Sequence, residues 1–458
     1  MSNVAAVVLA AGKGTRMKSG MVKVMHRICG RPMVEYPVAA AQEAGASQVV
    51  AVVGHQSESV QEYFSGAQGL SFRLQAEQLG TGHAVACAVP ALVGFEGPVF
   101  ILCGDVPLVR SETLRAMLEQ HRQSHATITV MTAFFDDPFG YGRIVRNADG
   151  QISKIVEEKD ATVTERGIKE INSGIYCVEF DFLAVAVANL KNDNAQKEYY
   201  LTDIITEAAA LGLPCLPFPV GDPAEISGVN DRVQLAEAAR VVRKRINDEL
   251  MLSGVTMIDP QTTYIDKHVA IEPDTIIHPN VTITGKTAIG KRCVIESGVT
   301  IHSCTVGDGV KVKVGSVLED STVHNEVAIG PMAHLRPGSE LMDHVKIGNF
   351  VETKKIVMGE GSKASHLTYL GDATIGRDVN IGCGTITCNY DGVNKHRTVI
   401  EDEVFVGSDV QFVAPVTIGR NSLIAAGTTV TKDVPPDSLA IARSPQVNKE
   451  GWKLKEKS

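Results

Sequence analysis

The stretch from Val281 to Ile301 reads VTITGKTAIGKRCVIESGVTI and places an isoleucine at every sixth position from 283 onward. An α-helix returns to one face every 3.6 residues and a β-strand every second residue, so neither repeat explains a strict six. A six-residue period is typical of a parallel β-helix, in which each hexapeptide forms one flat side and its aliphatic residue points into a narrow prism. This stretch therefore predicts a hexapeptide-repeat β-helix.

The same period extends over most of the second half of the chain, with single-residue slips after Ile301 and Leu318. Glycine follows several of the in-phase residues, where turns between short strands need a permissive backbone. A chance series of β-sandwich strands would lose the phase, so it is the weaker interpretation. We expect these side chains to point inward: Ile265, Ile271, Ile277, Ile283, Ile289, Ile295, Ile301, Val306, Val312, Leu318, Val323, Ile329, Leu335, Leu341, Ile347, Ile400, Val406, Phe412, Ile418, Ile424 and Val430.

Composition narrows the class of protein. A chain of 458 residues is too long for one ordinary core, and about two to three domains are expected. The net charge of −9 provides no basic field, so we expect neither nucleic acid nor a membrane as a partner. No apolar run approaches the ~18 residues of a membrane span. Nine cysteines without a Cys-x-x-Cys pair argue against structural zinc and disulfides, which predicts a cytoplasmic location.

The first half of the chain has a different pattern. Apolar runs at Val4–Leu9, Val49–Val53, Val99–Leu102 and Ile128–Val130 alternate with amphipathic helical stretches, which predicts a Rossmann-like α/β domain with parallel strands. Ligands of such domains bind at the carboxyl ends of the strands. A long helical pattern begins at Asp231. We therefore expect a domain at 1–230, a helical arm at 231–252 and the β-helix with its tail at 253–458.

The first predicted strand runs into the segment LAAGKGTRM, from Leu9 to Met17. Small residues let backbone N–H groups approach phosphates, and Lys13 and Arg16 supply countercharge. The segment matches neither a Walker P-loop nor the dinucleotide-binding glycine pattern. Together with Lys23 it resembles the signature of sugar-nucleotide pyrophosphorylases. That family has a proline before the lysine, where this chain has Val22.

Further matches to this family follow in order along the chain. The stretch from Gln75 to His83 resembles the uracil-reading segment of uridylyltransferases, and Gly104-Asp105 ends a strand where Mg²⁺ would want oxygen ligands. Cys103 stands where the family commonly has tyrosine. The resemblance implies Mg²⁺ ligands at Asp105 and Asn230. It implies UTP and sugar contacts at Leu9, Ala10, Ala11, Gly12, Arg16, Lys23, Gln75, Gly80, Thr81, Cys103, Gly104, Asp105, Gly142, Glu157, Asn172 and Asn230.

The second half carries motifs that resemble the hexapeptide acyltransferases, namely Leu335–Gly338, Gly348–Lys355, Ser365–Asp372 and Gly384–Gly392. A histidine is suited to remove a proton near neutral pH, which favours His366 as the catalytic base. The segment Gly384–His396 breaks the period and is expected to loop out of the prism. The resemblance implies sugar-phosphate contacts at Arg336, Lys354, Tyr369 and Asn380. It implies acetyl-CoA contacts at Cys383, Ser408, Ala426 and Arg443, with Asn389 and Tyr390 contacting both sugar and acetyl-CoA.

Taken together, the whole chain resembles the bacterial N-acetylglucosamine-1-phosphate uridylyltransferase/glucosamine-1-phosphate acetyltransferase family. The resemblance implies a homotrimer that uses acetyl-CoA, UTP and Mg²⁺. Two alternatives stay open. The β-helix could serve only assembly or regulation, with nucleotidyl transfer the sole activity, or the chain could be a non-catalytic subunit.

Overall fold

The computed structural model describes residues 3–54 and 56–452. Contacts divide the chain into two compact units between Val242 and Arg243, inside the long helix α8 (Arg232–Leu252). Each unit is described by itself. Within the described ranges, no helix is long and apolar enough to cross a membrane.

The first unit is built on one mixed sheet, in the order β11-β7-β10-β6-β1-β4-β5. β1, β4, β5 and β6 run parallel to one another, whereas β10 is antiparallel to both β6 and β7. The four predicted strands are confirmed as β1, β4, β6 and β7, and the antiparallel β10 departs from the all-parallel expectation. The strands are β1 Ala5–Ala10, β4 Gln48–Val53, β5 Leu70–Leu74, β6 Pro98–Cys103, β7 Ile128–Phe134, β8 Arg143–Arg146, β9 Ile152–Val156, β10 Glu170–Glu179 and β11 Cys215–Pro219, with a small separate pair β2 Arg27–Ile28 and β3 Arg31–Pro32.

Helices cover both faces of this sheet, because its central strands are apolar on both sides. One buried cluster contains residues of α1, α2 and α4, and a second contains residues of α3, α6 and α7. Register places Leu9 opposite Cys103, so β1 and β6 end side by side and their following loops meet at one edge. The helices are α1 Glu35–Glu43, α2 Glu58–Tyr63, α3 Thr81–Ala88, α4 Ser111–Gln123, α5 Val163–Arg166, α6 Phe180–Asn189 and α7 Asp203–Ala210.

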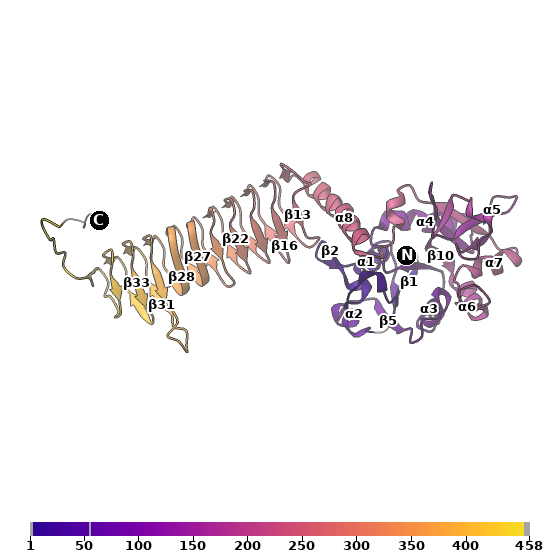
Figure 1. Ribbon diagram of the computed structural model, residues 1–458, viewed down its shortest axis with the longest axis horizontal. Helices are drawn as coiled ribbons and strands as arrows, with labels where there is room; N and C mark the ends of the chain where they lie inside the picture. The colour runs from indigo at the N-terminus through magenta and orange to yellow at the C-terminus, as the bar shows by residue number, and fades with distance from the viewer. Residues whose placement is uncertain (1–2, 55, 453–458) are drawn as a thin grey trace, which may run out of the picture. The chain divides into compact units, whose positions relative to one another are not determined.

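The second unit is a parallel β-helix whose short strands pair in three columns. Figure 1 shows its coils stacked from β13 to β33. Two longer strands, β27 Lys346–Met358 and β28 Lys363–Ile375, pass through all three columns. The first column holds β13 Tyr264–Ile265, β16 Thr282–Thr284, β19 Thr300–His302, β22 Val317–Glu319, β25 His334–Leu335, β30 Ile386–Cys388, β33 Gln411–Val413 and β36 Thr429–Val430.

The second and third columns complete the prism. The second holds β14 Ala270–Ile271, β17 Ala288–Ile289, β20 Thr305–Val306, β23 Thr322–Val323, β26 Glu340–Leu341, β31 Thr398–Ile400 and β34 Val416–Ile418. The third holds β12 Thr256–Met257, β15 Ile276–Ile277, β18 Val294–Ile295, β21 Lys311–Val312, β24 Ala328–Ile329, β29 Asn380–Ile381, β32 Phe405–Val406, β35 Leu423–Ile424 and β37 Leu439–Ala440.

The six-residue pattern explains this packing. Every aliphatic or aromatic residue expected to point inward, from Ile265 to Val430, is buried. One coil takes 18 or 17 residues in the region of the predicted site, as in the pairing of His334 with Glu352 and of Glu352 with Tyr369. The step from Ile386 to Gln411 takes 25 residues. The additional residues form a loop between β30 and β31, so the excursion begins at Asn389 rather than at the predicted Gly384.

Candidate active sites

In the loop after β1, the backbone of Gly14 packs directly against the side chain of Lys23. Gly14 has a φ of 60°, a left-handed conformation that favours glycine. A Cβ on Gly14 would stand 3.0 Å from Lys23 Cγ and 3.2 Å from Cδ, and closer still to Cβ. Val22, in the place of the family's proline, has φ −55° and ψ 133°, which is the conformation that proline adopts. The loop therefore keeps its shape without the proline.

Lys23 connects two residues that are distant in the sequence. Its Nζ lies 2.5 Å from Asp105 Oδ2 and 2.9 Å from Asn230 Oδ1, and Arg16 Nη2 donates to the same Asn230 oxygen at 2.9 Å. The Lys23 side chain is only 9% exposed. The structure therefore brings together Arg16 and Lys23 with the two predicted Mg²⁺ ligands, Asp105 and Asn230; the predicted countercharge of Lys13 takes no part in these hydrogen bonds.

The same atoms fit a divalent cation. Asp105 and Asn230 direct one oxygen each at a single centre of positive charge, the Lys23 ammonium, and such oxygen donors are those that Mg²⁺ prefers. Across residues 3–54 and 56–452, no three His, Cys, Asp or Glu side chains cluster as a metal site. A Mg²⁺ ion held here would complete its coordination with water and substrate phosphate, as is usual for this ion.

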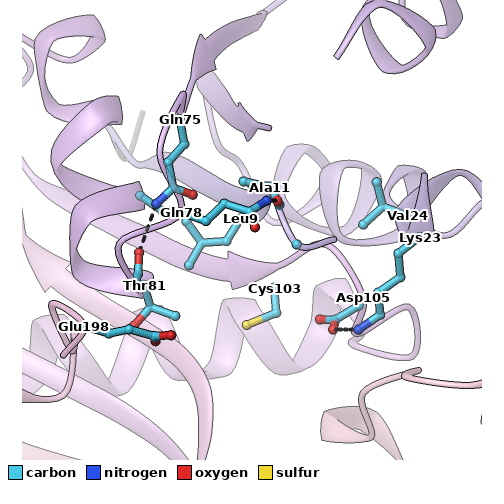
Figure 2. Close-up of a pocket in the computed structure, with 13 residues that line it drawn as sticks. Leu9, Ala11, Lys23, Val24, Gln75, Gln78, Thr81, Cys103, Asp105 and Glu198 are labelled. Carbon is cyan, nitrogen blue, oxygen red and sulfur yellow. Dashed lines mark hydrogen bonds and ion pairs between the residues drawn. The ribbon is translucent and has the colours of Figure 1, made fainter. Parts of the chain in front are cut away.

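A cavity of about 310 Å³ opens beside this charge cluster (Figure 2). Gln78 donates a hydrogen bond from its amide to the carbonyl of Ala11 and so holds the glycine-rich loop to the cavity wall. Nine of the predicted residues line the cavity, and Val24, Gln78, Ala84 and Glu198 complete it. The nine are Leu9, Ala11, Gly12, Lys23, Gln75, Gly80, Thr81, Cys103 and Asp105.

Ala10 and Gly104, which do not line the cavity, support it from behind. Ala10 is buried at the end of β1. Gly104 donates from its N–H to the carbonyl of Leu9 at 2.9 Å, and a Cβ there would stand 3.0 Å from that oxygen. The close approach of the two strand ends therefore depends on glycine at 104.

A second cavity of about 220 Å³ shares Leu9, Thr81 and Cys103 with the first. The predicted sugar-site residues Gly142, Glu157 and Asn172 line it. A bulge in β10 between Asn172 and Tyr176 turns this part of the strand, and Asn172 donates to the Tyr176 hydroxyl at 2.7 Å.

Two titratable groups of the second cavity have shifted pKa values. Burial raises the pKa of Glu157. The hydrogen bond that its Oε1 accepts from the Thr202 hydroxyl at 3.3 Å acts against this shift, and the charges of nearby acidic residues add to it. Burial, and next the charge of Asp105, raises the pKa of Cys103 to about 12. The Cys103 thiol therefore stays protonated near neutral pH and acts as a small lining group between the two cavities.

In the second unit, positive charges gather on consecutive coils. Arg336 Nη1 donates to Glu352 Oε1 at 2.8 Å. The neighbouring Lys395, and next Arg336, lowers the pKa of Lys354. Cations held close enough to lower the pKa of one of them favour an anion such as a phosphate beside them. Lys395 was not singled out from the sequence, because it lies on the loop whose path the period does not predict.

Polar groups adjoin these cations. Asn389 Nδ2 donates to Asp372 Oδ2 at 2.5 Å, and the carboxylate of Asp372 lies near enough to Lys354 to act on its pKa. The Tyr369 hydroxyl and the Asn389 amide both lie over Gly371, where a Cβ would stand 2.9 Å from the amide nitrogen and closer to the hydroxyl. The structure thus joins Asn389 and Tyr369 to the group of Arg336 and Lys354.

The loop that carries Lys395 is organised by Asp391. Its carboxylate accepts from the backbone N–H of Val393 at 2.8 Å and of Asn394 at 2.7 Å, and lies 2.6 Å from His396 Nε2. These hydrogen bonds hold the pKa of Asp391 well below its ordinary range. Tyr390, 60% exposed, donates from its hydroxyl to the carbonyl of Gly392 at 2.6 Å.

The remaining predicted residues follow one corner of the β-helix. Backbone hydrogen bonds stack this corner from coil to coil, from Gly384 to Leu367, from Asp409 to Cys383 and from Gly427 to Ser408. Arg443 donates to the carbonyl of Ala426 at the end of the series. The corner therefore aligns these predicted residues: His366, Cys383, Ser408, Ala426 and Arg443.

Two of the predicted residues, Asn380 and His366, do not join the cation group by hydrogen bonds within one chain. Asn380 lies in β29 of the third column, whereas Tyr369 lies in the first. His366 is exposed, and its imidazole has no hydrogen-bond partner in the part of the chain that the structure describes. One chain therefore places Asn380 in a different column from the cation group and leaves the His366 imidazole without a hydrogen-bond partner among the described residues.

The fold and the two sites define a class, a nucleotidyltransferase domain joined to a hexapeptide-repeat transferase domain. The MobA-like NTP transferase domain matches residues 6–153, the GMPPB C-terminal domain matches residues 260–347, and the bacterial transferase hexapeptide (six repeats) matches residues 397–432. The predicted fold class is thereby confirmed, an α/β Rossmann-like nucleotidyltransferase domain followed by a left-handed parallel β-helix.

Relatives of full length identify the family. The chain is 72% identical to the bifunctional protein GlmU of Geotalea uraniireducens, over 100% of both chains. It is 65% identical to the bifunctional protein GlmU of Pelobacter propionicus, over 100% of this chain and 99% of the relative, and 68% identical to that of Geotalea daltonii, over 100% of both. The chain belongs to the GlmU family of bifunctional transferase enzymes.

Proposed function

We propose that the chain catalyses two consecutive steps toward UDP-N-acetylglucosamine. The β-helix acetylates glucosamine 1-phosphate from acetyl-CoA, and the first unit then transfers uridylyl from UTP to N-acetylglucosamine 1-phosphate. Residues 1–230 carry out uridylyl transfer and residues 253–458 carry out acetyl transfer. Residues 231–252 form a helical arm between them. A cytoplasmic location, where these metabolites feed cell-envelope synthesis, accords with the cysteine usage.

The convergence of Asp105 and Asn230 on Lys23 is the observation that carries the first activity. In uridylyl transfer, a phosphate oxygen of the sugar attacks the α-phosphorus of UTP, and the bond to pyrophosphate breaks on the opposite side. Negative charge is spread over the oxygens around phosphorus, so catalysis depends on positioning and on nearby cations. Lys23 and Arg16, fixed through Asn230, supply that charge.

Asp105 and Asn230 would hold Mg²⁺ with one oxygen each. When bound, this ion would neutralise phosphate charge. The chain's own part is to orient both substrates, with the base beside Gln75 and Gly80 and the sugar in the cavity lined by Glu157 and Asn172.

The β-helix presents the complementary chemistry. Arg336, Lys354 and Lys395 bind the phosphate of the amino sugar, and His366 accepts the proton that its amine loses. The amine nitrogen attacks the carbonyl carbon of the thioester, and CoA leaves as the thiolate. The corner that aligns His366 with Cys383, Ser408, Ala426 and Arg443 supports binding of acetyl-CoA along it.

A homotrimer would unite the parts that one chain keeps apart. Asn380 and the cation group lie in different columns, so a neighbouring copy would complete the site. Large apolar side chains support such an interface, since Phe350 and Leu367 are each 61% exposed on successive coils and Phe405 is 52% exposed. Sedimentation of the intact protein measures the assembly.

A one-pot reaction tests the two activities together. Purified protein is given glucosamine 1-phosphate, acetyl-CoA, UTP and Mg²⁺, and products are read by mass spectrometry. UDP-N-acetylglucosamine, free CoA and pyrophosphate are expected. If product forms only from preformed N-acetylglucosamine 1-phosphate, the β-helix serves assembly or regulation instead. If no uridylyl transfer occurs with either sugar, the chain is a non-catalytic subunit.

A further inference from the structure

The amide of Gln75 has a fixed orientation in the nucleotide cavity. Gln75 lines the cavity and is only 4% exposed. Its Nε2 lies 3.0 Å from the carbonyl oxygen of Gly80 and 3.1 Å from Nδ1 of His83. A primary amide nitrogen carries two hydrogens and accepts none, so both neighbours must be acceptors for this arrangement to be satisfied.

His83 meets that condition in one protonation form. It lies in the first turn of α3, half-buried, with Nε2 3.9 Å from the sulfur of Cys87. When Nδ1 accepts from Gln75, Nε2 carries the ring proton and faces this weak acceptor. Burial raises the pKa of the Cys87 thiol, which keeps the sulfur neutral beside the imidazole. The tilted packing of the His83 and Tyr199 rings, with centroids 6.4 Å apart, holds the ring in place.

This arrangement decides what Gln75 presents to a base. Figure 2 shows the nitrogen of Gln75 engaged in the dashed hydrogen bond and its oxygen turned to the side on which Leu9 lies. If the amide flipped, its oxygen would face the Gly80 carbonyl, and the hydrogen bond to His83 would survive only in the tautomer that carries the ring proton on Nδ1 and leaves none on Nε2 for the Cys87 sulfur. Gln75 therefore offers an acceptor to the cavity.

An acceptor at this position distinguishes the two pyrimidines. The ring nitrogen N3 of uracil carries a hydrogen and donates, whereas N3 of cytosine carries a lone pair and accepts. The Gln75 oxygen attracts the first and repels the second, and buried polar mismatches of this kind strongly disfavour the wrong ligand.

We infer that His83 is a specificity-determining positioning residue, which together with the Gly80 carbonyl fixes the amide orientation of Gln75 and so selects UTP over CTP. His83 acts through Gln75 and does not itself touch the base. The inference rests on the proposed uridylyl transfer, since it concerns the nucleotide of that reaction.

The test compares the full-length protein with two variants of similar side-chain size. His83→Leu removes the acceptor, and His83→Asn keeps an oxygen near the position of Nδ1. The rate constant kcat/KM is measured for UTP and for CTP, with N-acetylglucosamine 1-phosphate and Mg²⁺, from pyrophosphate release. His83→Leu is expected to lower the ratio of UTP to CTP about three- to tenfold, the worth of one hydrogen bond, and His83→Asn to leave it within about twofold.

Each outcome decides a different question. If His83→Leu lowers kcat/KM for UTP and for CTP in equal proportion, His83 is merely structural and the inference is overturned. If the Leu variant loses its thermal unfolding transition, His83→Ala, for which the same change in ratio is expected, replaces it. If the unaltered protein transfers neither nucleotide, the proposed function fails, and that result is distinct from an unchanged ratio in an active enzyme.

Discussion

Replacing Gly14 by alanine should uncouple the two activities. The new Cβ would stand 3.0 Å from Lys23 Cγ, whereas non-bonded carbons stay about 3.5–4.0 Å apart, so the lysine stem must move by roughly 1 Å at Cβ and beyond. The φ of 60° adds about 1–2 kcal/mol for a residue with a Cβ. Lys23 would then leave the position that joins Asp105 to Asn230.

A shift of about 1 Å at a reacting centre can cost a factor of ~10² in rate. Uridylyl transfer by Gly14→Ala is therefore expected to fall about 100-fold in kcat/KM, with acetyl transfer unchanged, because the β-helix is a separate unit. Gly20→Ala is the matched control, since a Cβ there meets nothing within 4 Å. Pyrophosphate release and free CoA report the two activities on one preparation. Equal rates of uridylyl transfer in Gly14→Ala and Gly20→Ala would refute the conclusion that the contact between Gly14 and Lys23 positions the lysine.

Three further changes have definite expected results. Val22→Pro, at a φ of −55°, is expected to raise the free energy of unfolding by about 0.4–1 kcal/mol in denaturant titrations, and a clear loss would show that the loop does not keep the proline conformation. Because burial raises the pKa of Glu157, the folded state holds this proton more tightly than the unfolded chain, so ionisation lowers stability above the ordinary range of a glutamate. Glu157→Gln should therefore raise the midpoint of thermal unfolding at pH 7 and not near pH 4 while slowing uridylyl transfer; an equal gain at both pH values contradicts this reasoning. Asp391→Ala should raise the KM for glucosamine 1-phosphate by releasing the loop of Lys395 and leave the uridylyl KM for UTP unchanged, and parallel changes in both constants would count against it.

The sequence predicted the β-helix in detail because one burial rule repeats. Each coil has to fill the prism at one position in six, so the phase alone identified inward residues such as Ile295 and Phe412. The rule failed where a polar residue fills the prism. Thr387 is buried in β30, with its hydroxyl accepting from the N–H of Gly371 at 2.7 Å, and this replacement hid the coil that was predicted to loop out.

In the first site, the residues on motifs that follow strand ends were predicted from the sequence. Residues that other loops bring to the cavity were not predicted. Asp105 and Lys23 came from such motifs. Gln78 lay inside a recognised stretch but was not singled out, because its contact with Ala11 forms only when the two loops meet in the folded chain. Glu198 belongs to a loop without a pattern of its own, and only the folded chain brings it to the cavity. Likewise, the buried stretch of β10 from Ile175 to Val178 is apolar like the parallel strands, so composition does not give the direction of β10.

The 25-residue step between Ile386 and Gln411 means that residues of the loop can change during evolution without changing the residues that stabilise the β-helix. The coils before and after it pair as if the loop were absent, since Thr374 meets Val399 in ordinary parallel register. A new segment can therefore enter at the corner between the first and second columns without altering the strand pairing on either side, provided that its two ends leave β30 and enter β31 at the same positions. The segment from Asn389 to Arg397 is accordingly a natural place to graft other loops, with the prism serving as an inherited frame for acyl transfer to new acceptors.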